Sequence, residues 1–238
     1  TYDNQTVYLD NKQILSNAWA GKLQIDHGLP NARFFAAGKD FQFLVSDGNQ
    51  ILYLNQSGEK LWTGTFAGLK EIKYQTAGDR FVLVCETKVA VFTRSENTIR
   101  TIYEGTKITC AEPLENSETI AVGTSEGYLL YPENRLISKL PCTEITCISE
   151  IDGELWFGST KGAFKLNKKG NYSYFAGERW LPGNRIVDVE KGPDKSVLVL
   201  TDKGLGQIFQ KEMTLEEKAL FYEKQVREKN IRYGFNCS

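Results

Sequence analysis

The feature that most constrains this chain is a short phrase of strand, polar turn and strand that recurs along its length. The phrase is "LWFGSTKGAF" at residues 155–164. Similar phrases stand at residues 43–52, 82–91, 120–129 and 197–206. A recurrence at a fixed period indicates that one small structural unit is stacked several times along the chain.

A second apolar run lies upstream of each copy and gives the period. Its anchor residues are Phe34, Ile72, Ile108, Ile145 and Ile186, and successive anchors are separated by 38, 36, 37 and 41 residues. A period of about 40 residues with several short strands per unit is typical of propeller blades, each a four-stranded antiparallel sheet. The turns between the strands are too short for helices, so we expect an all-β fold.

The unit at residues 144–177 predicts its four strands one by one. "EITCISEI" alternates and meets the turn pair "DG", and the nearly all-apolar "ELWFGS" is expected for a strand between neighbouring blades. "AFKLN" and "YSYFAG" supply the third and fourth strands. One blade cannot cover its own apolar faces, so the units are expected to stack around a ring.

Glycines mark two kinds of position in the repeat. Just after the central strand we expect turns with positive φ, at Gly48, Gly127, Gly162 and Gly204. Gly123 and Gly158 lie inside the central strand, where glycine costs stability unless another backbone packs close to it.

The residues before Phe34 do not complete a unit. Residues 6–10, 12–15 and 22–26 are three candidate strands, and the first strand of that unit is missing. We expect a β-propeller of about six four-stranded blades, closed when residues 231–235 ("IRYGF") supply the missing strand. The alternative is five blades, with the N-terminal strands completing the last one.

The C-terminal region has a different pattern. Thr214 and Glu217 form a capping box at the start of residues 214–229. Apolar residues follow on one helical stripe: Leu215, Ala219, Tyr222 and Val226. We expect one amphipathic helix that packs on the ring or leads to another domain, so the predicted domains are a propeller at 1–212 and a helix with its tail at 213–238.

Composition narrows the classes of function. The chain has 29 basic and 30 acidic residues, so its net charge does not indicate binding to nucleic acid or to an anionic membrane. No apolar run approaches the roughly 20 residues that span a bilayer.

The five cysteines are scattered and include no CxxC pair, so neither a disulfide framework nor a zinc site is predicted. We interpret Cys85, Cys110 and Cys147 as small buried hydrophobic residues. No catalytic, metal-binding or nucleotide-binding motif is present, so we predict no catalytic residues, metal or cofactor.

Three stretches carry a family resemblance. They are "LPGNRIVDVEKGPDKSVLVLTDKGLGQI" at 181–208, "DHGLPNARF" at 26–34 and "GELWFGSTKGAFKL" at 153–166. Over residues 20–210 the chain resembles the two-component-regulator propeller repeat family. The resemblance implies an extracytoplasmic bacterial module, periplasmic or secreted, of the kind that serves as the sensor region of membrane histidine kinases and is tied to complex carbohydrates. Full sensors carry more repeats, so a missing neighbouring domain is expected.

The candidate ligand-binding residues come from loops that a propeller gathers at one end of its channel. They are Trp19, His27, Arg33, Trp62, Trp180, Asn184 and Arg185. Indole faces stack on sugar rings and guanidinium groups pair with carboxylates, so this set would suit an acidic glycan. Alternatively, the tryptophans cover blade edges and His27 is a solvent-exposed turn residue.

We therefore expect a non-catalytic recognition or sensor-like module that binds a glycan or a protein partner. The alternatives are a polysaccharide-acting lyase or hydrolase with its site at the channel mouth, or a purely architectural domain. A polar channel pocket with His27 near a tyrosine or carboxylate would favour the enzyme, and a flat aromatic rim would favour binding.

Overall fold

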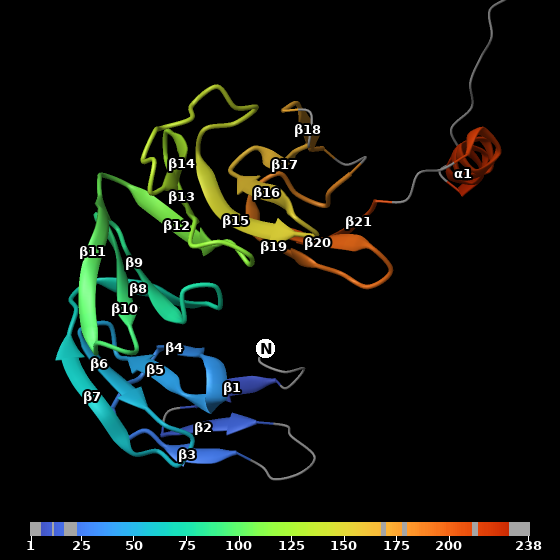
Figure 1. The fold of residues 1–238 in the computed structure, drawn as a ribbon. Helices are drawn as coiled ribbons and strands as arrows, with labels where there is room; N and C mark the ends of the chain where they lie inside the picture. Colours follow the sequence, from blue (N-terminus) through green and yellow to red (C-terminus); the bar gives the residue numbers. More distant parts are fainter. Residues whose placement is uncertain are drawn as a thin grey trace, which may run out of the picture.

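The computed structural model describes residues 6–10, 12–16, 23–167, 170–177, 180–210 and 214–228. In this part of the chain, 21 strands form six antiparallel sheets, and one α-helix follows them. Figure 1 shows the sheets side by side along an arc around a common centre. The first strand of each sheet contacts the first strand of the next, and later strands pair outwards in chain order. This is the all-β propeller architecture that the repeats predict.

The first three sheets are as follows. Sheet 1 consists of β1 (Val7–Leu9), β2 (Gln13–Ser16) and β3 (Gln24–Asp26). Sheet 2 consists of β4 (Phe34–Ala37), β5 (Phe43–Ser46), β6 (Gln50–Leu54) and β7 (Lys60–Thr65), with a 3-10 turn at Lys39–Phe41. Sheet 3 consists of β8 (Leu69–Gln75), β9 (Arg80–Cys85), β10 (Lys88–Thr93) and β11 (Thr98–Glu104).

The other three sheets complete the arc. Sheet 4 consists of β12 (Ile108–Pro113), β13 (Ile120–Thr124) and β14 (Gly127–Tyr131). Sheet 5 consists of β15 (Ile145–Ile151), β16 (Glu154–Ser159), β17 (Gly162–Leu166) and β18 (Tyr172–Phe175), which confirms the predicted four-stranded unit. Sheet 6 consists of β19 (Ile186–Lys191), β20 (Ser196–Thr201) and β21 (Gly204–Phe209).

Sheet 1 corrects one prediction. Its three candidate strands are all formed, but the missing strand is not the first one. β1 contacts β4, the inner strand of sheet 2, and Val7 of β1 lines the cavity at the centre of the arc, so β1 is the inner strand of sheet 1. Among the described residues, it is therefore the outer, fourth strand of sheet 1 that is missing. Residues 231–235, which were predicted to close the ring, lie outside the described residues.

Pairing between the first two strands of a sheet defines equivalent positions around the arc. Ile108 pairs with Thr124, Ile145 with Ser159 and Ile186 with Thr201, and each inner strand has a bulge directly afterwards. In sheet 3 the corresponding pair is Leu69 with Cys85. Ile72 was therefore the wrong anchor, because it lies three residues beyond the equivalent position.

A hydroxyl at the end of the second strand shapes the recurring turn. Ser159 Oγ accepts from the Lys161 N–H at 3.2 Å and donates to Gly162 O at 2.6 Å. Thr124 and Thr201 make the same two bonds in sheets 4 and 6. The predicted positive φ is confirmed, with values of 106°, 145°, 143° and 143° at Gly48, Gly127, Gly162 and Gly204.

The two glycines inside central strands accommodate side chains rather than another backbone, which corrects the prediction. A Cβ on Gly158 would lie 2.5 Å from Cys147 Sγ and 2.6 Å from Ile186 Cγ2. A Cβ on Gly123 would lie 2.6 Å from Cys110 Sγ and 3.0 Å from Ile145 Cγ2. Each glycine thus makes room for the inner-strand cysteine and for the anchor isoleucine of the next sheet.

The core lies between adjacent sheets, as the apolar central strands predict. Trp156 and Phe157 on β16 are fully buried on opposite faces of sheet 5, in contact with sheets 6 and 4 respectively. Cys85 and Cys110 are buried and Cys147 is partly buried. These three cysteines and Cys142 are free, so no disulfide joins the four that the structure describes.

The helix α1 (Leu215–Glu228) forms where the capping box predicts it. The Thr214 N–H donates to Glu217 Oε2 at 2.9 Å, and the Glu217 N–H donates to Thr214 Oγ1 at 3.2 Å. Figure 1 shows α1 standing apart from the sheets, and Leu215 and Tyr222 of its apolar stripe are exposed. The expectation that the helix packs on the ring is therefore wrong. That the helix leads to another domain, and that the propeller domain ends at residue 212, stay predictions. Among the described residues, no helix has both the length and the apolar character needed to cross a membrane.

Candidate binding site at the central channel

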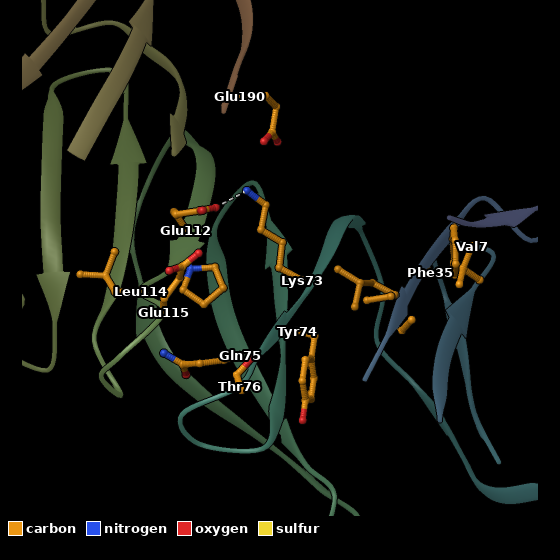
Figure 2. Close-up of a pocket in the computed structure, with 14 residues that line it drawn as sticks. Val7, Phe35, Lys73, Tyr74, Gln75, Thr76, Glu112, Leu114, Glu115 and Glu190 are labelled. Atoms are coloured by element: carbon orange, nitrogen blue, oxygen red, sulfur yellow. Dashed lines mark hydrogen bonds and ion pairs between the residues drawn. The ribbon is translucent and has the colours of Figure 1, made fainter. Parts of the chain in front are cut away.

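Inner strands from five of the six sheets surround a central cavity of about 470 Å³. Figure 2 shows the residues that line it. They are Val7 from β1, Phe35–Ala37 from β4, Ile72–Thr76 from and after β8, Glu112–Glu115 from and after β12, and Glu190 from β19. Because Tyr74–Thr76 and Pro113–Glu115 lie at the ends of their strands, the cavity lies toward the end of the channel where the inner strands finish.

An ion pair crosses the cavity wall between neighbouring sheets. Lys73 Nζ lies 2.6 Å from Glu112 Oε2 and 3.4 Å from Glu71 Oε1. Figure 2 shows Glu112, Lys73 and Glu190 pointing towards one another, with the Lys73–Glu112 pair dashed. Burial lowers the pKa of Lys73, but the two carboxylates outweigh burial and hold that pKa above its ordinary value, so the amine stays charged.

Two carboxylates of the cavity, those of Glu112 and Glu190, are harder to ionise than free ones. Burial raises the pKa of Glu112, and the nearby Lys73 offsets this only in part. Burial and the neighbouring Asp188 raise the pKa of Glu190, with Lys73 again opposing. The net result is a polar cavity with three glutamates and one lysine in its lining, in which acceptor oxygens outnumber the single cation.

Hydrogen bonds hold the wall of the cavity in place. Arg80 Nε donates to Gln75 Oε1 at 2.7 Å, and Gln75 Nε2 donates to the carbonyl oxygens of Ser117 and Thr119 at 3.0 Å. On the other side, the Glu115 N–H donates to Glu150 Oε2 at 2.7 Å. The hairpin between β12 and β13 is therefore fixed from both neighbouring sheets.

This arrangement offers fixed hydrogen-bonding groups beside apolar surface, which is the usual composition of a small-molecule site. Phe35 and the ring of Tyr74 supply apolar area, whereas the Tyr74 hydroxyl already donates to Asp79 Oδ1 at 2.6 Å. Within the described ranges, no group of three or more His, Cys, Asp or Glu side chains could hold a metal ion.

His27 does not lie in the cavity. The residue is 1% exposed, so the solvent-exposed alternative is wrong, whereas the ligand-binding assignment of His27 stays a prediction. Nδ1 accepts from the Leu29 N–H at 3.1 Å, and Nε2 lies 3.3 Å from Asp10 O, which assigns the ring proton to Nε2. The imidazole therefore links the turn after β1 to the segment after β3.

The tryptophans are dispersed. Trp62 on β7 is half-buried and packs on Phe92 of sheet 3, with ring centroids 4.9 Å apart, so it covers a blade edge. Trp180 is 44% exposed and makes a T-shaped contact with Phe175, with ring centroids 5.4 Å apart. Trp19 lies outside the described residues.

The two arginines lie at the opposite end of the channel from the cavity. Arg33 and Arg185 directly precede β4 and β19, at equivalent positions where inner strands begin, and both are exposed. Asn184 is exposed too, but its Oδ1 accepts from the Gly177 N–H at 2.7 Å. The structure thus brings Trp180, Asn184 and Arg185 together on one loop, and their ligand binding stays a prediction.

The sequence reasoning missed Lys73, Glu112 and Glu190. These three residues occupy equivalent positions on the inner strands β8, β12 and β19. The register with the second strand of each sheet shows this, because Lys73 pairs with Val82, Glu112 with Ala121, and Glu190 with Leu198. Alignment on the true anchor, Leu69 in place of Ile72, would have put these charged side chains in one row around the channel.

Comparisons with known proteins agree with the propeller fold. No family model matches the chain, and no curated protein matches its sequence. It is similar to the solved extracellular domain of a putative hybrid two component system from B. thetaiotaomicron, at 12% identity and a TM-score of 0.64 over 88% of this chain and 32% of that one.

Two further solved structures have the same fold. PorZ, a surface component of the type-IX secretion system of Porphyromonas gingivalis, is 13% identical, with a TM-score of 0.61 over 86% of this chain and 31% of that one. The Pan2 WD40 domain of Neurospora crassa is 10% identical, with a TM-score of 0.65 over 89% of this chain and 74% of that one. The chain spans about a third of the length of the first two structures. At these identities the likeness shows the fold: the chain is a β-propeller with a polar cavity in its channel.

Proposed function

We propose that this propeller is a non-catalytic, extracytoplasmic recognition module that binds a neutral carbohydrate in the channel cavity. The observation that carries the proposal is the row of Lys73, Glu112 and Glu190 around a cavity of about 470 Å³ that is also lined by apolar side chains such as Phe35. Carboxylates accept hydrogen bonds from sugar hydroxyls, and apolar rings contact the faces of the sugar. Three carboxylates and one amine disfavour an anionic sugar, because like charges repel.

The location outside the cytoplasm and the neighbouring domain are parts of the same proposal. They are supported by the likeness to an extracellular domain of a two component system and to a bacterial surface component, both much longer than this chain. The enzyme alternative receives no support from His27, since that side chain is enclosed in sheet 1 rather than exposed in the cavity.

The test is a glycan array with the purified chain, followed by calorimetric titration of each neutral oligosaccharide that binds. Glu190→Ala and Glu112→Gln should weaken binding by about tenfold or more, because each removes an acceptor from the cavity. Trp180→Ala and Arg185→Ala serve as matched controls at the other end of the channel and should bind normally.

Three outcomes would contradict the proposal. Absence of binding to every glycan on the array would remove carbohydrate as the ligand. Loss of binding in Trp180→Ala or Arg185→Ala, with normal binding in Glu190→Ala, would move the site to the loop at 176–185. Cleavage of a bound oligosaccharide, detected by mass spectrometry, would show an enzyme.

A further inference from the structure

Sheet 6 presents an apolar face that nothing in the described chain covers. Leu200 on β20 is 42% exposed, and Leu205 and Phe209 on β21 are 61% and 60% exposed. Leu200 and Leu205 are directly paired, so their side chains lie side by side on the face that points away from sheet 5.

The equivalent positions of sheets 3 and 5, each of which is followed by another sheet, are buried. Counting from the turn, the Leu200–Leu205 pair is equivalent to Gly158–Ala163 in sheet 5 and to Val84–Val89 in sheet 3. Ala163 and Val89 are 0% exposed, because the anchor isoleucine and inner strand of the next sheet pack on them. The exposed face of sheet 6 is therefore one half of the interface that repeats between sheets.

The other half of this interface is exposed at the opposite end of the arc. Tyr8 of β1 pairs with Leu15 of β2, and Tyr8 is 49% exposed. The opposite face of sheet 1, which includes Ile14 and Ile25, packs on sheet 2. Figure 1 shows sheets 1 and 6 at the two ends of an open arc, and the described strands of the two sheets do not pair with each other.

The row of charges at the channel is incomplete at the same place. Lys73 on β8 neutralises Glu112 on β12, one sheet further along. Glu190 occupies the equivalent position on β19, and among the described residues no ion pair to its carboxylate is found. A cationic side chain on an inner strand beside β19 would complete the row.

We propose that one further four-stranded antiparallel sheet of the same repeat type docks between sheet 6 and sheet 1. Its inner strand carries a β-branched aliphatic residue at the anchor position and a lysine or arginine at the level of Glu190. The apolar face at Leu200, Leu205 and Phe209 and the face at Tyr8 then become ordinary interfaces between sheets, and the cation pairs with Glu190.

The first test asks whether the ring closes on itself instead. The chain with Tyr8→Cys and Leu205→Cys, and with Cys142 and Cys237 changed to serine, is treated with a short bismaleimide. We expect no intramolecular cross-link, because the opening between the two positions has the width of a further sheet. An efficient cross-link within the monomer would overturn the proposal, since sheets 1 and 6 would then meet directly.

The second test supplies a candidate sheet for the opening. Because one sheet cannot cover its own apolar faces, a copy of residues 143–177 with Ser149→Lys is attached to the C-terminus of the full chain by a flexible linker. Ser149 stands at the level of Glu190, because its partner Trp156 is equivalent to Leu198. The monomeric fusion should unfold at a higher urea concentration than the chain itself, and this gain should be smaller when the added unit keeps its serine.

Protein variants locate the docking. In the fusion, Leu205→Lys with Phe209→Lys should abolish the gain in stability without affecting folding of the chain alone, because both side chains are exposed. Leu136→Lys, on the exposed loop after β14, is the matched control and should keep the gain. An absent gain, or an equal gain in the double variant, would overturn the proposal. Self-association that the double variant abolishes, measured by light scattering, would also overturn it, because a second copy would then occupy the face.

Discussion

Lys73 Nζ lies 2.6 Å from Glu112 Oε2, so an ion pair joins the inner strands of sheets 3 and 4 at the channel wall. Both side chains are mostly buried. A pair of this kind is costly to break from one side, because the remaining charge is left without its partner.

We expect Lys73→Met to lower the free energy of unfolding by about 2–4 kcal/mol and Glu112→Gln by about 1–2 kcal/mol. Lys73→Met with Glu112→Leu should cost less than the two single changes together. Urea unfolding at pH 7 measures these differences. Lys191→Met, which breaks an exposed pair with Asp152, is the control and should have little effect. Equal effects of Lys73→Met and the control would refute a structural role for the channel pair.

The raised pKa of Glu190 predicts a pH dependence of stability. A carboxyl whose pKa is higher in the folded state binds its proton more tightly there, so its contribution to stability falls as pH rises from the ordinary value of 4.5 through the raised pKa. Glu190→Gln should reduce the loss of stability between pH 4.5 and pH 7, with a gain below about 1 kcal/mol at pH 7. Urea midpoints at the two pH values measure it, and Glu133→Gln is the exposed control. An unchanged pH dependence in Glu190→Gln would contradict the prediction.

Gly158 is required by the two side chains that lie against it. Gly158→Ala should destabilise the protein by about 1–3 kcal/mol, because the new Cβ overlaps Cys147 Sγ and Ile186 Cγ2. Adding Cys147→Ala should restore only part of the loss, since the isoleucine contact persists. Gly206→Ala is a milder control, with its nearest neighbour, Leu181 Cδ2, at 3.1 Å. Thermal unfolding compares the variants, and a neutral Gly158→Ala would disprove the close packing.

His27 is expected to act in folding and not in recognition. His27→Leu should lower stability by about 1–3 kcal/mol, because the Leu29 N–H and the Asp10 carbonyl lose their shared partner. The affinity of the folded variant for any glycan that the wild type binds should be unchanged. Denaturation and calorimetric titration measure the two properties, and lost affinity with full stability would return His27 to the candidate site.

The thiols on the inner strands of sheets 4 and 5 should be unreactive in the folded protein. Burial raises the pKa of Cys110 and of Cys147 to about 12, so the thiolate fraction at pH 8 is about 10⁻⁴. Iodoacetamide at pH 8 should label Cys142, which is partly exposed, well before either of them. Mass spectrometry after timed quenching identifies the labelled cysteines. Rapid labelling of Cys147 would show that the inner strand of sheet 5 opens.

The positions of the sheets could be predicted from local pattern because each strand is specified by its own alternation and each turn by its own glycine. The unit at 144–177 and the capping box at Thr214 are examples, since both depend on residues a few positions apart. The row of charged residues at the channel could not be predicted in the same way. Lys73, Glu112 and Glu190 are far apart in sequence and become neighbours only when the bulge after each anchor sets the register of three different strands.

The sequence by itself determined that a four-stranded unit recurs, because periodic burial and turn chemistry are local properties of the chain. Only the tertiary structure decided what the side chains do: it enclosed His27, separated Trp62 from Arg185, and left Leu205 exposed. Whether a side chain faces the channel, a neighbouring sheet or solvent depends on how the sheets pack on one another, and that packing joins residues too distant in sequence for any local pattern to relate.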